Sequence, residues 1–148
     1  MVFHGSWGHG SSKKKLKILI DSGCTMPCIV NKRVEITAAR LRRASHVPTR
    51  VRTGGGVMET NAKVWHNQHI TVGNTSVAVS TITQLDVSSL NYDMILGYPF
   101  LTQHNPVPNW KTGELKFKNF IWKPVTTYVN QRAQFAAMCL QGAELETF

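Results

Sequence analysis

The chemistry of this chain centres on a carboxylate that follows an apolar run and precedes a hydroxyl residue and a glycine. Residues 16–20 read Leu-Lys-Ile-Leu-Ile, and Asp21, Ser22 and Gly23 come directly after them. Consecutive β-favouring apolar residues are typical of a strand buried on both faces, which would carry the Asp21 carboxylate into a poorly hydrated interior. The hydroxyl can then donate a hydrogen bond, and the glycine allows close approach of another chain or a ligand. An Asp-Ser-Gly turn after a strand would use the same residue types without any catalytic role.

Two later segments favour the catalytic interpretation over a simple turn. A glycine run occupies positions 54–56, and residues 91–101 read Asn-Tyr-Asp-Met-Ile-Leu-Gly-Tyr-Pro-Phe-Leu, followed by His104-Asn105-Pro106 and by Trp110. Because these motifs follow one another in this order along the chain, residues 1–120 resemble the retropepsin-like aspartic proteases, most closely the protease of Ty3/gypsy-type retrotransposon polyproteins. Cys24 stands where that family usually has alanine.

The resemblance implies a fold and a set of site residues. The fold would be mainly β, a retropepsin-like closed β-barrel that forms half of an acid protease, with one or two short helices. Asp21 would be the catalytic residue, and no metal or cofactor would be needed. The active-site loop would be supported by Ser22, Gly23 and Thr25. A mobile flap that closes over the substrate would contain Gly54, Gly55, Gly56, Val57 and Met58. A structural motif under the active site would consist of Ile95, Leu96 and Gly97.

The implied activity is that of an aspartic endopeptidase that cleaves extended polypeptide during retroelement polyprotein processing. The chain has 148 residues and one Asp-Ser-Gly, whereas a two-lobed aspartic protease carries both acids in one chain of about twice this length. A symmetric homodimer would therefore supply the second carboxylate. Asp93 is a second candidate for the catalytic acid, but the family has no catalytic residue at that position. A surface or capping role is expected for Asp93. The alternative function is a domesticated protease fold kept as a non-catalytic binding or assembly module.

Composition adds expectations about partners and location. The formal net charge is +9, which would give weak, non-specific attraction for nucleic acid, although solvated charge on strand and helix surfaces is the favoured explanation. Three cysteines without a signal-peptide pattern predict free thiols in a reducing interior, hence the cytoplasm or virus-like particles within it. No apolar run approaches the roughly 18 residues of a membrane span. The sequence reads as an excerpt of a polyprotein or as a stand-alone domesticated gene.

Local patterns predict the elements that position these residues. Val2 and Phe3 should form an edge strand, and Asn31 should cap a helix that carries Val34, Ala38 and Leu41 on one face. Residues 47–87 should form strands, with breaks at 54–56 and 73–74 that predict two hairpins.

The last part of the chain has further signals. Residues 91–96 should form a second buried strand, residues 98–104 a short helix stopped by Asn105-Pro106, and residues 110–117 a closing hairpin. We expect one protease domain over residues 1–120. A tail or linker over residues 121–148 has apolar residues at roughly helical spacing, which favours a C-terminal helix.

Overall fold

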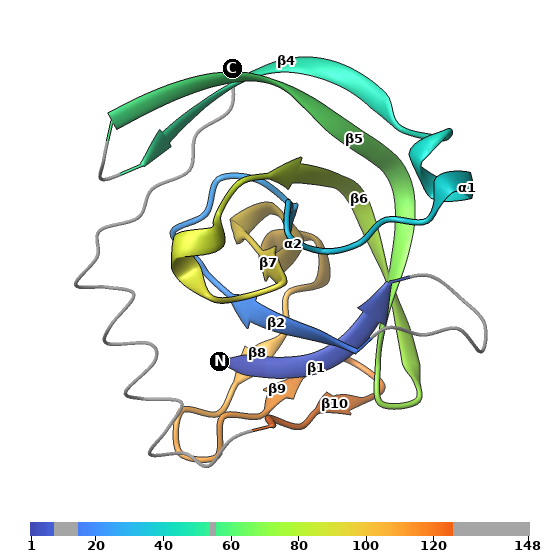
Figure 1. The fold of residues 1–148 in the computed structure, drawn as a ribbon. Coiled ribbons are helices and arrows are strands. Elements are labelled where there is room, and N and C mark those ends of the chain that lie inside the picture. Colours follow the sequence, from blue (N-terminus) through green and yellow to red (C-terminus); the bar gives the residue numbers. More distant parts are fainter. Residues whose placement is uncertain (8–14, 54–55, 126–148) are drawn as a thin grey trace.

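The structure is a computed structural model that describes residues 1–7, 15–53 and 56–125 of the chain (Figure 1). The strands are β1 (Val2–Trp7), β2 (Leu16–Ile20), β3 (Cys28–Asn31), β4 (Ser45–Thr53), β5 (Gly56–Val72), β6 (Thr75–Leu85), β7 (Met94–Leu96), β8 (Val107–Pro108), β9 (Leu115–Lys116) and β10 (Ile121–Trp122). The helices are α1 (Ala38–Leu41), α2 (Tyr98–His104) and a 3-10 turn at Ser88–Leu90. The mainly β fold predicted from the sequence is confirmed.

Six strands form a ring of hydrogen-bonded neighbours. The order is β1, β2, β7, β3, β6 and β5, and β5 pairs again with β1, while β4 extends the sheet beyond β5 (Figure 1). The prediction that β1 is an edge strand was wrong. Its first half pairs with β2 and its second half pairs with β5, so both of its sides are used. This double pairing closes the sheet into the ring-like arrangement expected for the fold.

Strands β2 and β7 are neighbours in the ring, and both supply side chains to the two buried clusters. They pair in parallel, with Ile18 opposite Met94 and Ile20 opposite Leu96. Alternate residues point to opposite faces, so Ile18 and Leu96 join one buried cluster while the neighbouring Leu19 joins the other. All of these side chains are buried. The apolar runs of the sequence are therefore explained by burial on two sides.

Strand β7 is shorter than the predicted strand over residues 91–96. Asn91 has a left-handed backbone with φ of 51°, which interrupts an extended strand. The strand begins only at Met94, after the chain has turned.

The helix predicted to start at Asn31 was also placed incorrectly. Asn31 is the last residue of β3 and is fully buried, with its Nδ2 donating to the Tyr92 carbonyl at 2.9 Å. Helix α1 begins instead at Ala38, where the Thr37 side chain accepts a backbone N–H of the first turn at 3.3 Å. A polar side chain at a strand end satisfies backbone groups in the same way as a helix cap, so the two look alike in sequence.

The remaining local predictions are confirmed. Strand β4 pairs with β5, and β5 pairs with β6 around Gly73, which gives the two predicted hairpins. Helix α2 spans Tyr98–His104 and ends at Asn105, whose φ is 45°. The closing hairpin exists as β8 and β9, and β10 adds a third strand to this small sheet.

Helix α2 and the small sheet hold an aromatic cluster against the ring. The centroid of the Trp122 ring lies 6.0 Å from that of Phe100 of α2 and 4.7 Å from that of Phe117. The ring centroid of Phe3 of β1 lies 5.5 Å from that of Trp122. Trp122 follows residue 120, so packing continues just past the expected domain limit. The predicted helical tail falls on residues 126–148, outside the described part. Within the described residues, no helix is long and apolar enough to cross a membrane.

Candidate active site

Asp21 is the first residue after β2, and its backbone is fixed by the strand beside it. The Asp21 N–H donates to the Leu96 carbonyl of β7 at 2.9 Å, and the Asp21 carbonyl accepts the Cys24 N–H at 3.1 Å. The second bond closes a tight turn directly after the strand. The Gly23 N–H donates to Oδ1 of the Asp21 carboxylate at 2.9 Å. One oxygen of the acid is thus held within its own loop.

The Asp21 side chain is half-buried, while Ser22, Gly23 and Thr25 are exposed. Burial raises the pKa of the Asp21 carboxyl above its ordinary value, and the Gly23 N–H opposes this shift by stabilising the charged form. The acid is therefore poorly hydrated, yet it lies in a loop that reaches the surface. Such a carboxyl group is suited to holding or passing a proton.

The raised pKa predicts a measurable effect on stability. Ionising Asp21 opposes folding, so its contribution favours the folded state below the unfolded pKa of about 3.8 and is lost as pH rises through the higher folded pKa. Asp21→Asn removes this ionisation while keeping an oxygen for the Gly23 N–H. In calorimetry at pH 7 the variant should unfold at a higher temperature than the wild type, and the difference should close near pH 4. A variant less stable than the wild type at pH 7 would contradict this assignment.

Gly23 is not needed for a special backbone conformation. Its φ lies outside the left-handed region that favours glycine. An added Cβ would lie 3.3 Å from Asp21 Oδ1, the end of a side chain that can adjust.

Residues 95–97 lie directly beneath this loop. The Gly97 N–H donates to the Pro27 carbonyl at 3.0 Å, and the next N–H, from Tyr98, donates to the Cys24 carbonyl at 2.8 Å. A Cβ on Gly97 would overlap the Met26 carbonyl oxygen and would lie 2.7 Å from the Cys24 oxygen. Only glycine allows the two segments this close. The end of β7 therefore fixes the loop after Asp21 from below.

The two cysteines near the loop are buried thiols, as expected. Burial raises the pKa of Cys24 to about 11 and also raises the pKa of Cys28 well above its ordinary value. Thiols with raised pKa values are poor nucleophiles and poor metal ligands. Cys139 lies outside the described residues.

Asp93 is engaged in structural contacts. Its Oδ2 accepts the Lys17 backbone N–H at 2.8 Å, and its Oδ1 accepts Nε of Arg33 at 3.3 Å. An ion pair of 3.3 Å joins the same carboxylate to Arg33. The capping role predicted for Asp93 is confirmed.

Comparison with known proteins was made for family and for fold. Residues 17–123 match the family described as the PEG10/RTL1 protease domain. The chain belongs to this family. Among solved structures it is similar to the retroviral protease-like domain of Ddi1 from Leishmania major, with a TM-score of 0.58 and 17% identity over 85% of this chain and 94% of that chain. A comparison with curated proteins found no match. The retropepsin-like aspartic protease fold predicted from the sequence is confirmed.

In this PEG10/RTL1-family domain, the segment predicted to be a flap is the end of the β4–β5 hairpin. Gly54 and Gly55 lie outside the described residues. Gly56 has a φ of 125°, a conformation that favours glycine, and the Val57 and Met58 side chains are 54% and 42% exposed. Apolar side chains so exposed at a hairpin end are available to contact a ligand.

The arm of the same hairpin packs near the catalytic loop. Val51 of β4 is buried in one cluster with Cys24 and Ile95, whereas the hairpin end is exposed. The structure therefore brings the hairpin arm, the loop and the strand beneath the loop into one packed unit.

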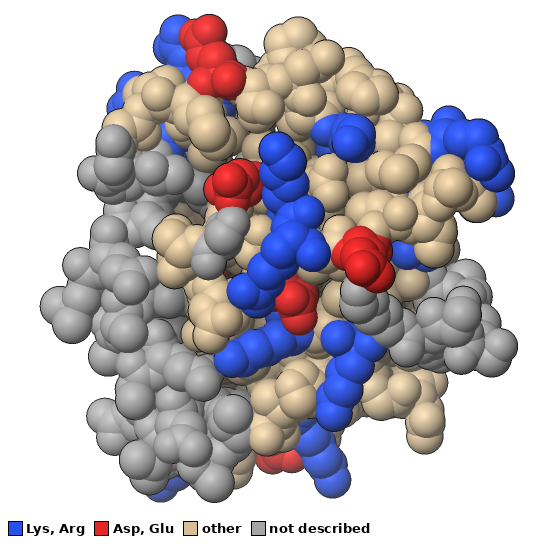
Figure 2. All heavy atoms as spheres, viewed as in Figure 1, with Lys and Arg blue, Asp and Glu red and all other residues tan. Residues whose placement is uncertain are grey.

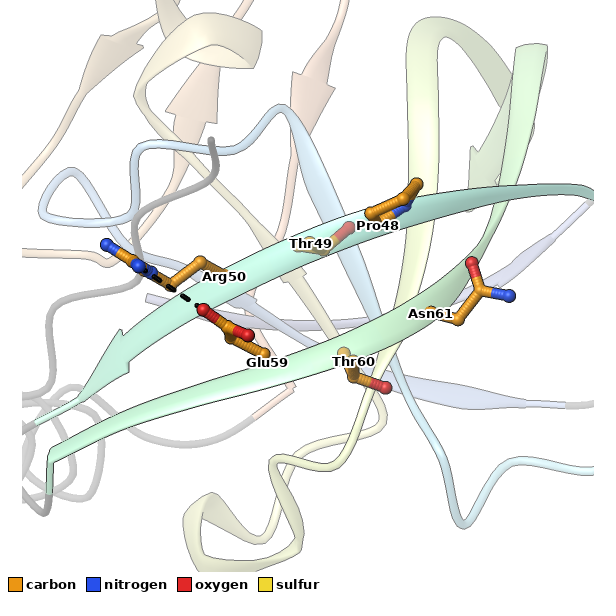
Figure 3. A pocket seen from close by; sticks show the side chains of 6 residues that line it. All are labelled: Pro48, Thr49, Arg50, Glu59, Thr60 and Asn61. Carbon is orange, nitrogen blue, oxygen red and sulfur yellow. Dashed lines mark hydrogen bonds and ion pairs between the residues drawn. The ribbon is translucent and has the colours of Figure 1, made fainter.

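One hollow of the protease domain lies on this hairpin and not at the acid. Its volume is about 670 Å³, and it is lined by Pro48, Thr49, Arg50, Glu59, Thr60 and Asn61. Arg50 and Glu59 form an ion pair of 3.2 Å across the two strands (Figure 3). None of these residues belongs to the loop of Asp21.

A smaller hollow adjoins the loop and was missed in the sequence. Its volume is about 350 Å³, and its lining includes Ile20, Ser22, Tyr98, Leu101, Pro108 and Trp110. These residues come from β2, α2 and the small sheet, which are far apart in the chain. No local pattern could have grouped them.

Charged groups of both signs share the face of the protease domain seen in Figure 2. Lys and Arg side chains run down its centre, with Asp and Glu groups among them. The expected attraction for nucleic acid stays a prediction. Within the described residues, no group of three or more His, Cys, Asp or Glu side chains is placed to hold a metal ion.

Proposed function

We propose that this chain is an aspartic endopeptidase that acts as a homodimer, with one Asp21 from each copy. The observation that carries the proposal is the half-buried Asp21 carboxyl, whose pKa is raised by burial, on a surface loop held by Gly23 and by the end of β7. The family and the fold support it. Because the sequence has one Asp-Ser-Gly, the second acid comes from the second copy.

Two Asp21 carboxyl groups facing each other would hold one proton between them at mildly acidic pH, because two charges in a poorly hydrated site repel. The ionised member takes a proton from a water molecule as this water attacks the peptide carbonyl. The protonated member donates a hydrogen bond to the developing oxyanion. The two pKa values belong to the pair, and they predict a bell-shaped, acid-shifted pH profile.

The substrate class is an extended polypeptide, such as a retroelement polyprotein, processed in the cytoplasm or in virus-like particles. An extended chain offers backbone groups for strand-like hydrogen bonds and places alternate side chains in pockets. The exposed Val57 and Met58 at the hairpin end would contact such side chains from above.

The test is to incubate the purified chain with a random peptide library between pH 4 and pH 8. We expect internal peptide-bond cleavage that is greatest on the acid side and is blocked by a statine-type inhibitor, which mimics the tetrahedral intermediate. Cleavage that resists the inhibitor would point to a contaminating protease. The absence of cleavage at every pH would reject the enzyme and favour a binding or assembly module.

A further inference from the structure

We propose that Ser45 is a phosphorylation site for a protein kinase whose substrate groove is acidic. Residues 41–45 read Leu-Arg-Arg-Ala-Ser, which places two arginines three and two residues before a hydroxyl group. The sequence contains no other pair of adjacent arginines. The site is separate from the loop of Asp21 and does not depend on the proposed protease activity.

The two arginines supply the charge that such a kinase would recognise. Arg42 and Arg43 directly follow α1, and both are exposed. A guanidinium group donates paired hydrogen bonds to a carboxylate, so two neighbouring arginines fit a groove lined by Asp and Glu side chains. Arg40 is used differently, because it donates to the Trp7 carbonyl at 3.1 Å and lies 4.2 Å from the centroid of the Trp7 ring. The fold therefore uses Arg40 for packing and presents Arg42 and Arg43 to a partner.

The Ser45 hydroxyl group lies at an accessible end of the sheet. Ser45 is exposed and is the first residue of β4, which follows α1 and its turn (Figure 1). It lies opposite Val64, at the end of the β4–β5 ladder that is farthest from the hairpin turn. Within the described residues, β4 is the end strand of its sheet, so no strand pairs with its other side. A kinase can therefore reach Ser45 without displacing a neighbouring strand.

The segment before Ser45 can open locally. A groove that reads side chains at fixed positions along a peptide requires an extended chain. Helix α1 has four residues and none of them is buried, and helices this short are not stable by themselves. The backbone N–H groups of residues 42–44 close the turn after it, with donor–acceptor distances of 3.0–3.2 Å. Opening the segment breaks these few exposed hydrogen bonds, which is a local event and not global unfolding.

Contacts on both sides of the segment keep the rest of the fold in place when it opens. Before the segment, Nε1 of Trp65 donates to the Arg40 carbonyl at 2.8 Å. After it, the Thr49 and Val51 side chains of β4 are buried. Opening is therefore confined to the residues between these two anchors.

The reaction transfers a phosphoryl group from ATP bound to Mg²⁺ in the kinase. The Ser45 Oγ forms a bond to the γ-phosphorus, the bond between this phosphorus and the bridging oxygen of the departing ADP breaks, and the hydroxyl proton passes to a base of the kinase. The product carries a charge of about −1.5 to −2 at pH 7 next to two guanidinium groups. Because the site is exposed and these neighbouring charges are opposite in sign, the fold tolerates the new group.

The experiment incubates the purified chain with ATP, Mg²⁺ and the catalytic subunit of a cAMP-dependent protein kinase, whose substrate groove is acidic. We expect phosphate on Ser45, located by mass spectrometry, and a loss of at least about tenfold in total incorporation for Ser45→Ala. Arg42→Gln and Arg43→Gln should each lower kcat/KM at least about tenfold, because each removes charge-assisted hydrogen bonds to the groove. The matched control is Arg52→Gln, the same change at an exposed arginine of β4, which should alter kcat/KM less than about twofold. Circular dichroism of each variant checks that it is folded.

The results separate a true site from incidental labelling. Incorporation that persists in Ser45→Ala, or a rate that falls equally with Arg52→Gln, would overturn the proposal. The absence of phosphate on Ser45 in the folded chain would overturn it as well, and a synthetic peptide of residues 38–48 that is phosphorylated under the same conditions would show that the fold hides the hydroxyl group. The peptide-library assay judges the protease activity separately.

Discussion

An excess of Asp21→Asn protein should suppress cleavage by the wild-type protein. A mixed dimer has one carboxyl and one amide, and it lacks the acid pair that activates water. With three variant subunits for each wild-type subunit and random pairing, only one wild-type partner in four is active, so cleavage per wild-type subunit should fall to about one quarter. The measurement is the initial rate on a cleaved library peptide, at concentrations where sedimentation shows dimers.

The control is an equal excess of Glu35→Gln, an acid-to-amide change on the exposed loop after β3 that leaves both Asp21 residues in place. It should raise the total rate in proportion to the added protein. If Asp21→Asn alone retains cleavage, Asp21 is not the catalytic acid. If excess variant leaves the rate per wild-type subunit unchanged, the acids are not shared between copies.

Gly97→Ala should be the most destabilising substitution near the site. The added methyl group would overlap the Met26 carbonyl oxygen and crowd that of Cys24, and both are backbone atoms with little room to move. Relief requires either the loop after Asp21 or the end of β7 to shift, which breaks hydrogen bonds on both sides. We expect a loss of about 3 kcal/mol or more in the free energy of unfolding, measured by urea titration.

Gly23→Ala is the matched control, because it adds the same methyl group to the same loop. Its Cβ would lie 3.3 Å from Asp21 Oδ1, the end of a side chain that can adjust, and its backbone has no left-handed φ. The stability loss should stay below about 1 kcal/mol. Equal losses for the two variants would show that the close approach at Gly97 does not constrain the loop.

Sequence reasoning succeeded where one local signal dominates. The apolar run before Asp21 predicted a doubly buried strand, and Asn105-Pro106 predicted the end of α2, because the first depends on a local pattern and the second on backbone sterics. The family resemblance rested on the same short segments, and the matched family and the fold confirm it.

Prediction from the sequence failed where contacts between distant segments decide the local structure. The double pairing of β1 depends on β5, and the hollow beside Ser22 depends on Tyr98 and Trp110 from separate elements. At Asn31 a strand-end amide satisfies a carbonyl from a distant turn, and nothing nearby in the sequence distinguishes it from a helix cap. Such features follow from tertiary packing, which no window of a few residues contains.

The parallel pairing of β2 with β7 also sets the order in which the site can form during synthesis. Asp21 is synthesised well before Leu96, the last residue of the strand that holds its backbone, and before Gly97, which follows that strand. Contacts between such distant segments form late, since the intervening chain must first be closed into a loop. In a nascent chain, the loop after Asp21 therefore lacks the contacts from Leu96, Gly97 and Tyr98 until these residues have been translated.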